Sequence, residues 1–97
     1  MATDAKRIHL QLDSDPRFAA AAGGAVRYLA EAIGLPEHEC REFQQDTVNA
    51  CMTAFSAHNA HPHTVELCRF EDRLEVTVDP ASGSAAQRLS RSIVPRG

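Results

Sequence analysis

The sequence predicts an α+β fold, a two-layer sandwich in which two long helices cover one face of a mostly antiparallel sheet. Three observations predict it. Alternating apolar residues near the N-terminus indicate a half-buried strand, and apolar residues spaced by three and four then indicate two helices. Two later alternating segments joined by a charged turn indicate a hairpin. Helices with one apolar stripe and a sheet with one apolar face bury these surfaces against each other.

The first strand is predicted over residues 7–12, and the first helix follows after a short break. The apolar positions of the strand are Ile8, Leu10 and Leu12. Asp15 suits the helix cap because its carboxylate accepts from free backbone N–H groups, and Pro16 suits the first helical position. The predicted buried stripe of this helix is Phe18, Ala22, Val26, Leu29 and Ile33. Gly23 and Gly24 indicate close approach of another element or of a ligand, and helix packing is the preferred interpretation.

A second helix is predicted from about Glu37 to about His58. Gly34 and Pro36 mark the break before it, since glycine often ends helices and proline often begins them. The predicted buried stripe is Cys40, Phe43, Thr47, Ala50, Cys51, Ala54 and Phe55. Gln45 and Asn49 lie four residues apart, so their amide side chains point the same way. Such a polar pair needs partners, and either a ligand or hydrogen bonds within the fold would serve.

The C-terminal half predicts a hairpin and then a short helix. Residues 64–70 and 74–79 alternate as two antiparallel strands, joined by the charged turn Glu71-Asp72-Arg73. Proline, serine and glycine then break the chain. Residues 85–93 are predicted as a short helix because Leu89 and Ile93, four residues apart, would share one helical face.

Length and composition bound the classes of function. A chain of 97 residues is predicted to be one domain, 1–97, with a core over about 7–80 and a C-terminal segment over 81–97. The formal net charge of −3 argues against a nucleic-acid partner. No apolar run reaches membrane-spanning length or follows the N-terminus as in a signal peptide. We therefore expect a cytoplasmic protein that does not bind membranes.

Three segments together resemble a known family. They are the first strand with its helix, the helical run Gln45-Asp46-Thr47-Val48-Asn49-Ala50-Cys51-Met52-Thr53-Ala54-Phe55, and the hairpin from Phe70 to Asp79. In this order they resemble the N-terminal part of the histidine-kinase-like ATPase (GHKL) superfamily, and most of all bacterial anti-sigma-factor serine kinases. The helical run is similar to the N box of that family, Glu-x-x-x-Asn-Ala-x-x-His-Ala-Tyr. The resemblance implies a truncated ATPase fold, because the ATP lid and the second glycine-rich box have no counterpart.

The resemblance also implies which residues would bind nucleotide. Asn49 would hold Mg²⁺ and the ATP phosphates, and an amide oxygen is a suitable ligand for Mg²⁺. Asp79 would bind the adenine amino group. Gln45 stands where the family has its catalytic Glu, and an amide cannot accept a proton. In the family this Asp begins an Asp-x-Gly-x-Gly run, whereas Asp79 is followed by Pro80-Ala81-Ser82-Gly83, which does not keep the glycine spacing. No catalytic residue is therefore expected, kinase activity is expected to be lost, and no cofactor is expected, with Mg-ATP as the alternative.

Three functions follow as hypotheses. The first is a degenerate anti-sigma-factor-like regulator that acts by protein–protein binding in bacterial transcription control. Its expected partners are a sigma factor or an anti-anti-sigma protein, and it is expected to form a homodimer that covers an exposed sheet edge. The second is an ATP-binding serine/threonine kinase of the anti-sigma-factor type. The third is a small interaction module unrelated to nucleotide.

Other side chains have plainer interpretations. His58, His61 and His63 cluster near Pro62 and could bind Zn²⁺ or Ni²⁺, but solvated loop histidines are the preferred interpretation. The three cysteines are expected to be reduced, buried thiols, and Cys51 to serve packing rather than nucleophilic catalysis; they are Cys40, Cys51 and Cys68. The basic residues Arg88, Arg91 and Arg96 predict a solvated helix face, with contact to an acidic partner as the alternative.

Overall fold

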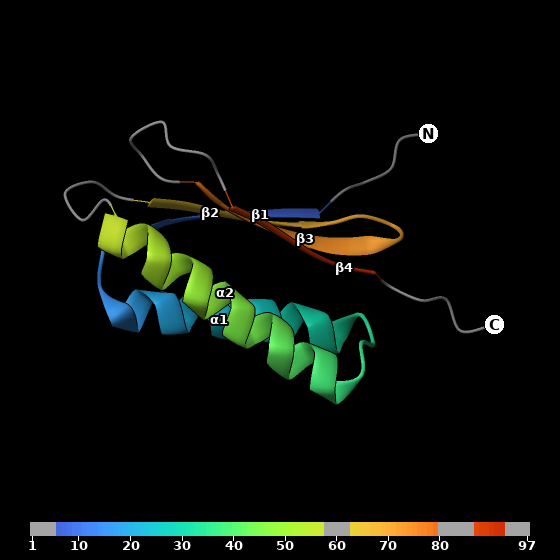
Figure 1. Cartoon of the computed structure of the whole chain (residues 1–97). Helices are drawn as coiled ribbons and strands as arrows, with labels where there is room; N and C mark the ends of the chain where they lie inside the picture. The colour runs from blue at the N-terminus through green and yellow to red at the C-terminus, as the bar shows by residue number, and fades with distance from the viewer. Residues whose placement is uncertain (1–5, 58–62, 80–86, 93–97) are drawn as a thin grey trace.

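Four strands form one antiparallel sheet, and two helices lie against one of its faces (Figure 1). The structure, a computed structural model, describes residues 6–57, 63–79 and 87–92. The elements follow in the order β1 (Lys6–Leu12), α1 (Pro16–Ala32), α2 (Glu37–Ala57), β2 (His63–Arg69), β3 (Arg73–Asp79) and β4 (Gln87–Ser92). The predicted α+β class, with two helices and an antiparallel sheet in two layers, is confirmed.

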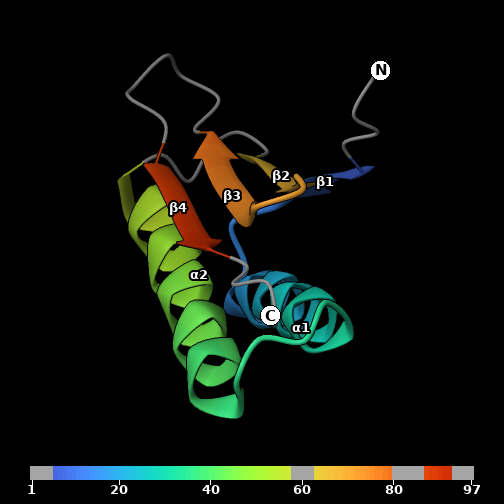
Figure 2. The same ribbon diagram turned by 90° about the vertical axis from the view of Figure 1, so that its right-hand side faces the viewer.

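The sheet has the strand order β1-β2-β3-β4, and every neighbouring pair is antiparallel. The register places Leu67 opposite both Ile8 of β1 and Val76 of β3, so apolar side chains line the side that faces the helices. We call the other side the open face. It carries Arg7, His9, Gln11, Thr64, Glu66, Cys68, Arg73, Glu75, Thr77, Asp79, Arg88, Ser90 and Ser92. In Figure 2, α1 lies on the side of β1 and β2, and α2 on the side of β3 and β4.

Local signals set the ends of α1 as the sequence predicts. Asp15 is the N-cap, and its side chain accepts from the backbone N–H of Arg17 at 2.9 Å. At the other end, Gly34 has a φ of +90°, a left-handed conformation that glycine adopts without steric cost. The N–H of Leu35 then donates to the carbonyl of Ala30 at 3.0 Å, so the turn satisfies a carbonyl that the helix leaves free.

The two helices approach closely at Gly23. A Cβ atom built there would lie 2.5 Å from Cγ2 of Val48 and 3.1 Å from the carbonyl oxygen of Gln44. The predicted helix packing at this glycine is therefore confirmed. Nearby, Arg27 of α1 donates to the side chains of Glu31 at 3.0 Å and Gln44 at 3.2 Å, which joins the two helices at their polar rim.

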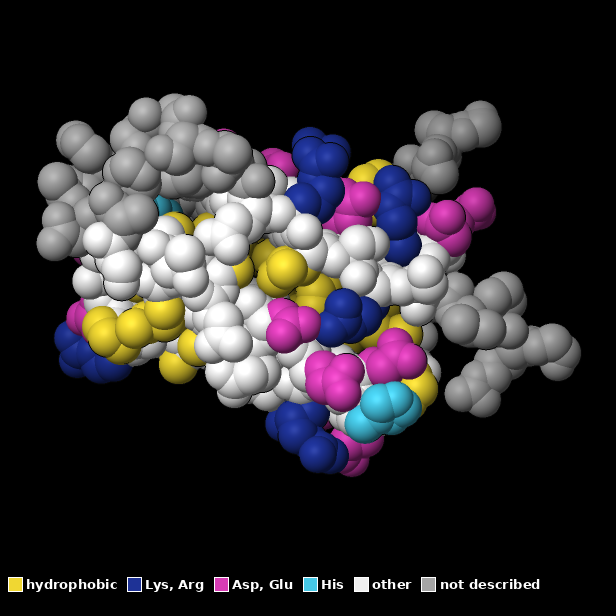
Figure 3. Space-filling model, in the orientation of Figure 1, with side chains coloured by type: hydrophobic (Ala, Val, Ile, Leu, Met, Phe, Trp, Pro, Cys, Tyr) yellow, Lys and Arg dark blue, Asp and Glu magenta, His cyan; other side chains and the backbone are white. Residues whose placement is uncertain are grey.

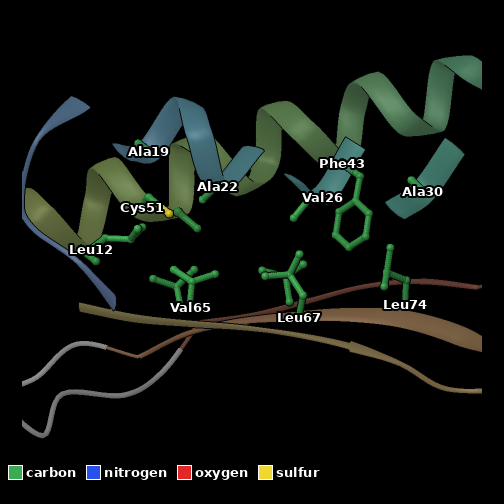
Figure 4. Packing of buried hydrophobic residues seen from close by; sticks show 14 of the residues in the cluster. Leu12, Ala19, Ala22, Val26, Ala30, Phe43, Cys51, Val65, Leu67 and Leu74 are labelled. Carbon is green, nitrogen blue, oxygen red and sulfur yellow. The ribbon is translucent and has the colours of Figure 1, made fainter. Parts of the chain in front are cut away.

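The core lies between the helices and the sheet, and Figure 4 shows side chains of both layers meeting there. Every residue of the stripe predicted for α2 is buried, so that prediction is confirmed. The stripe predicted for α1 is wrong at Phe18, which is 40% exposed. Ala22 and Val26 of the predicted stripe are buried, and the small residues Ala19, Gly23 and Ala30 fill the rest of the buried side, where α1 packs close to α2.

The short C-terminal helix predicted over 85–93 is wrong, because residues 87–92 form β4. Leu89 pairs with Val76 and packs against the core. The other two helix-facing side chains of β4 are polar and find partners on α2. The Gln87 side chain donates to the carbonyl of Ala50 at 3.1 Å, and Arg91 pairs with an α2 carboxylate. Ile93, the second apolar residue of the predicted helix, lies outside the described residues.

Candidate functional site

The amide pair of α2 lies on the side of the helix that faces away from the core. Thr47 is fully buried, and Gln45 and Asn49 each lie two residues from it, about 200° round the helix. Both amide side chains are accordingly exposed. Gln45 Nε2 donates to Asn49 Oδ1 at 3.1 Å. The predicted shared face is confirmed, and the two side chains hydrogen-bond to each other.

Asp79 does not join this pair. It is the last residue of β3, lies opposite Thr64 and is exposed on the open face. The helices cover the other face of the sheet, so the sheet separates Asp79 from Asn49. Residues 80–86, where the family's glycine-rich box would stand, lie outside the described residues.

Metal ligation at Asn49 would need further oxygen ligands around the ion. The amide oxygen of Asn49 already accepts from Gln45. Over residues 6–57, 63–79 and 87–92, no group of three His, Cys, Asp or Glu side chains is placed to hold a metal ion. Over the same residues, no helix is both long and apolar enough to cross a membrane.

Asp46, the neighbour of Gln45, points to β4. Its carboxylate accepts from Arg91 Nη2 at 2.6 Å, and the guanidinium of Arg91 lies 5.2 Å from the centroid of the Phe43 ring. The prediction that Arg91 lies on a solvated helix face is therefore wrong. The contact was missed because Arg91 was assigned to a helix, whereas the alternation of Gln87, Leu89 and Arg91 would have placed all three on one side of a strand.

His63 is not a solvated loop residue, and that prediction is wrong. It is the first residue of β2 and is fully buried. Its Nε2 lies 3.2 Å from Ser14 Oγ, and its ring centroid lies 5.1 Å from that of Phe55. Leu12 of β1 is its partner across the sheet. His58 and His61 lie outside the described residues.

The three cysteines are free and buried, as predicted. Burial raises the pKa of the Cys51 thiol to about 11 and also raises the pKa of Cys40. A thiol with a raised pKa carries little thiolate at neutral pH, and the thiolate is the nucleophile. The structure therefore supports a packing role for Cys51 in the core.

A pocket of about 310 Å³ lies between the C-terminal end of α1 and strands β1 and β2. Five apolar residues and two basic residues line it, and these are Ile8, Leu29, Ala32, Ile33, Leu67, Lys6 and Arg69. Sequence reasoning missed it, because Lys6 and Arg69 meet only through the pairing of β1 with β2. The one sequence signal for the pocket was Arg69. It occupies a helix-facing position of its strand, and the other helix-facing positions of that strand are apolar or histidine.

The surface over α2 and β4 carries intermixed basic and acidic side chains (Figure 3). Several of them form ion pairs, including Arg91 with Asp46 and Arg41 with Glu37. This face therefore has a mixed electrostatic character rather than that of a basic stripe.

Comparison with models of known protein families gave no match, and neither did comparison with characterised proteins. The likeness to histidine-kinase-like ATPases therefore depends on the residues of this chain and on the order of its elements.

Proposed function

We propose that the chain is a degenerate anti-sigma-factor-like regulator that acts by binding other proteins in bacterial transcription control, without kinase activity. One observation supports this most directly: the amide pair of Gln45 and Asn49 is exposed and internally hydrogen-bonded. Phosphoryl transfer needs a positioned base, Mg²⁺ and a closed phosphate site. Gln45 stands at the position of the base, and its amide cannot accept a proton. It therefore supplies none of these three requirements.

The order of the elements supports the regulatory part of the proposal. A strand, two helices and a hairpin follow each other as the resemblance implies. The run similar to the N box lies on α2, and Asp79, to which the resemblance assigns adenine binding, ends β3. A shortened relative that keeps this order of elements but lacks the catalytic Glu is a candidate for a role in binding other proteins.

Two surfaces are suited to protein partners. Strand β1 is an edge strand, and only Leu12 of its seven residues is buried. Its outer backbone N–H and C=O groups can pair with another strand. Large apolar side chains are also exposed on the helices, above all Tyr28, which is 72% exposed. A homodimer, a sigma factor or an anti-anti-sigma protein would cover such surfaces.

Two measurements test the proposal. The tagged chain is co-expressed with each sigma factor and anti-anti-sigma protein of its source organism. The molar mass of each purified complex is then measured by light scattering. A stoichiometric complex that forms without added ATP is expected. In parallel, calorimetric titration with Mg-ATP is expected to give a dissociation constant weaker than about 100 μM, roughly −5.5 kcal/mol.

The opposite results would contradict the proposal and favour another function. Mg-ATP binding tighter than about 100 μM, lost in Asn49→Ala but kept in the control Ser56→Ala on the exposed side of α2, would favour the serine kinase. Phosphoryl transfer that rises in Gln45→Glu would do the same. A chain that binds none of these proteins and no Mg-ATP would leave an interaction module unrelated to nucleotide.

A further inference from the structure

The pocket beside α1 has a volume and a lining that suit a small molecule. Leu29, Ala32 and Ile33 line it from the C-terminal end of α1, while Ile8 and Leu67 line it from the adjacent strands β1 and β2. Its volume of about 310 Å³ lies at the lower end of the range for small-ligand pockets, about 300–1,000 Å³. An apolar lining with a few charged groups is typical of such sites.

Two cationic side chains stand at one end of this lining. Lys6 of β1 and Arg69 of β2 are direct cross-strand partners and lie on the helix-facing side of the sheet. Both are exposed, and neither forms an ion pair with any residue that the structure describes. Most other arginines of the described chain do pair with carboxylates: Arg7, Arg17, Arg27, Arg41, Arg73 and Arg91. Among the residues that the structure describes, no carboxylate therefore pairs with the positive charge beside the pocket.

We propose that this pocket binds a small amphipathic carboxylate, such as a medium-chain acyl acid, with its chain on the apolar lining and its carboxylate between Lys6 and Arg69. The guanidinium of Arg69 can donate two parallel hydrogen bonds to a carboxylate, and Lys6 adds a second positive charge. A neutral apolar molecule would leave both charges unpaired, and an inorganic anion would leave the apolar lining uncovered. The proposal is independent of the function proposed above.

Decanoate, titrated below its micelle-forming concentration against the full chain, is the probe. Saturable 1:1 binding is expected, with a dissociation constant below about 1 mM for a ligand of this size. Decanol is expected to bind about tenfold more weakly, because it lacks the charge-assisted hydrogen bonds. Decyltrimethylammonium is expected not to saturate. Equal binding of all three, or no saturable binding of decanoate, would overturn the proposal.

Variants locate the site. Lys6→Gln combined with Arg69→Gln is expected to weaken decanoate binding to the level of decanol and to leave decanol unchanged. Ala32→Phe, at an exposed position of α1, is expected to fill the pocket and abolish binding of both. Arg88→Gln removes one positive charge from the open face and is expected to change neither. The thermal unfolding of each variant checks that it folds. Binding that survives Ala32→Phe, or that Arg88→Gln weakens as much as the double variant, would overturn the proposal.

Discussion

Gly23 and Gly24 are neighbours on α1, yet a methyl group at each would meet different surroundings. At Gly23 the new Cβ would overlap Val48 and crowd the backbone of Gln44, whereas at Gly24 it would meet nothing within 4 Å. We predict that Gly23→Ala lowers the free energy of unfolding by about 1–3 kcal/mol through overpacking. Gly24→Ala should raise it by about 0.5–1 kcal/mol, because alanine favours the helix.

Chemical denaturation of the two variants and the parent chain checks this pair. The substitution is the same in both, and the helix is the same, so the difference between them isolates the contact with α2. Equal effects of the two substitutions would mean that the helices do not meet at Gly23.

The Asp15 cap makes stability depend on pH. Hydrogen bonds from the Arg17 side chain and backbone lower the pKa of Asp15 below its ordinary value of 3.8. Because the folded pKa lies below the unfolded one, the stabilisation is present above pH 3.8 and is lost as the pH falls through the folded pKa. Asp15→Asn keeps a capping oxygen but removes the charge. We predict that the stability difference between the parent and this variant shrinks from pH 7 to pH 3.

Unfolding at the two pH values measures that difference. Asp13→Asn is the control, because Asp13 lies two residues earlier and its side chain caps no helix. A stability difference for Asp15→Asn that stays constant with pH would mean that the carboxylate gains nothing from its charge at the helix end.

At the scale of the element, the polar side chains of Gln87 and Arg91 join β4 to α2, while its Leu89 packs against the core. The Arg91 and Asp46 side chains that form its ion pair are 27% and 44% exposed, so the pair is worth about 0.5–1 kcal/mol. We predict that Arg91→Ala speeds amide hydrogen exchange in β4 and leaves that of β2 unchanged. Arg88→Ala, on the open face of the same strand, is the control and should leave both unchanged. Equal effects of the two substitutions would show that the ion pair does not anchor β4.

Most elements could be predicted from sequence because their apolar period is clear. The stripe of α2 and the alternation of β3 each bury one side, and the structure bears both out. Strand β4 was not predicted, because only one of its helix-facing residues, Leu89, is apolar. Its pairing with β3 cannot be seen from the residues of β4 alone. Phe18 was predicted to be buried because it lies four residues before Ala22, but the buried side of α1 runs through Ala19 and Gly23, small residues that allow close packing against α2.

Part of the candidate site, too, could be predicted from the sequence, and part could not. The shared face of Gln45 and Asn49 follows from helical geometry alone and holds in the structure. That this face points to solvent depends on how α2 packs, which its buried stripe determines. The pocket beside α1 could not be predicted, since Lys6 and Arg69 are brought together by the register of two strands that lie far apart in the chain.

At the scale of the whole molecule, the free edge of β1 is the feature with the widest consequence. Its seven residues end a four-stranded sheet, and Ile8 is 41% exposed. A second copy that pairs with this strand would extend the sheet across two chains and satisfy the outer backbone groups. We predict a homodimer of about 21 kDa, twice the 10.6 kDa of one chain, by size-exclusion chromatography with light scattering.

Two matched variants test where the copies meet. Ile8→Asp is expected to give a monomer, because antiparallel pairing about a two-fold axis would place both new carboxylates on one face of the joined sheet, where like charges repel. Met52→Asp is the control, since Met52 is 37% exposed on α2, and α2 lies on the side of β3 and β4 rather than of β1 (Figure 2). It should remain a dimer. A dimer that survives Ile8→Asp but not Met52→Asp would move the interface to the helices, and a monomeric parent chain would contradict self-association through β1.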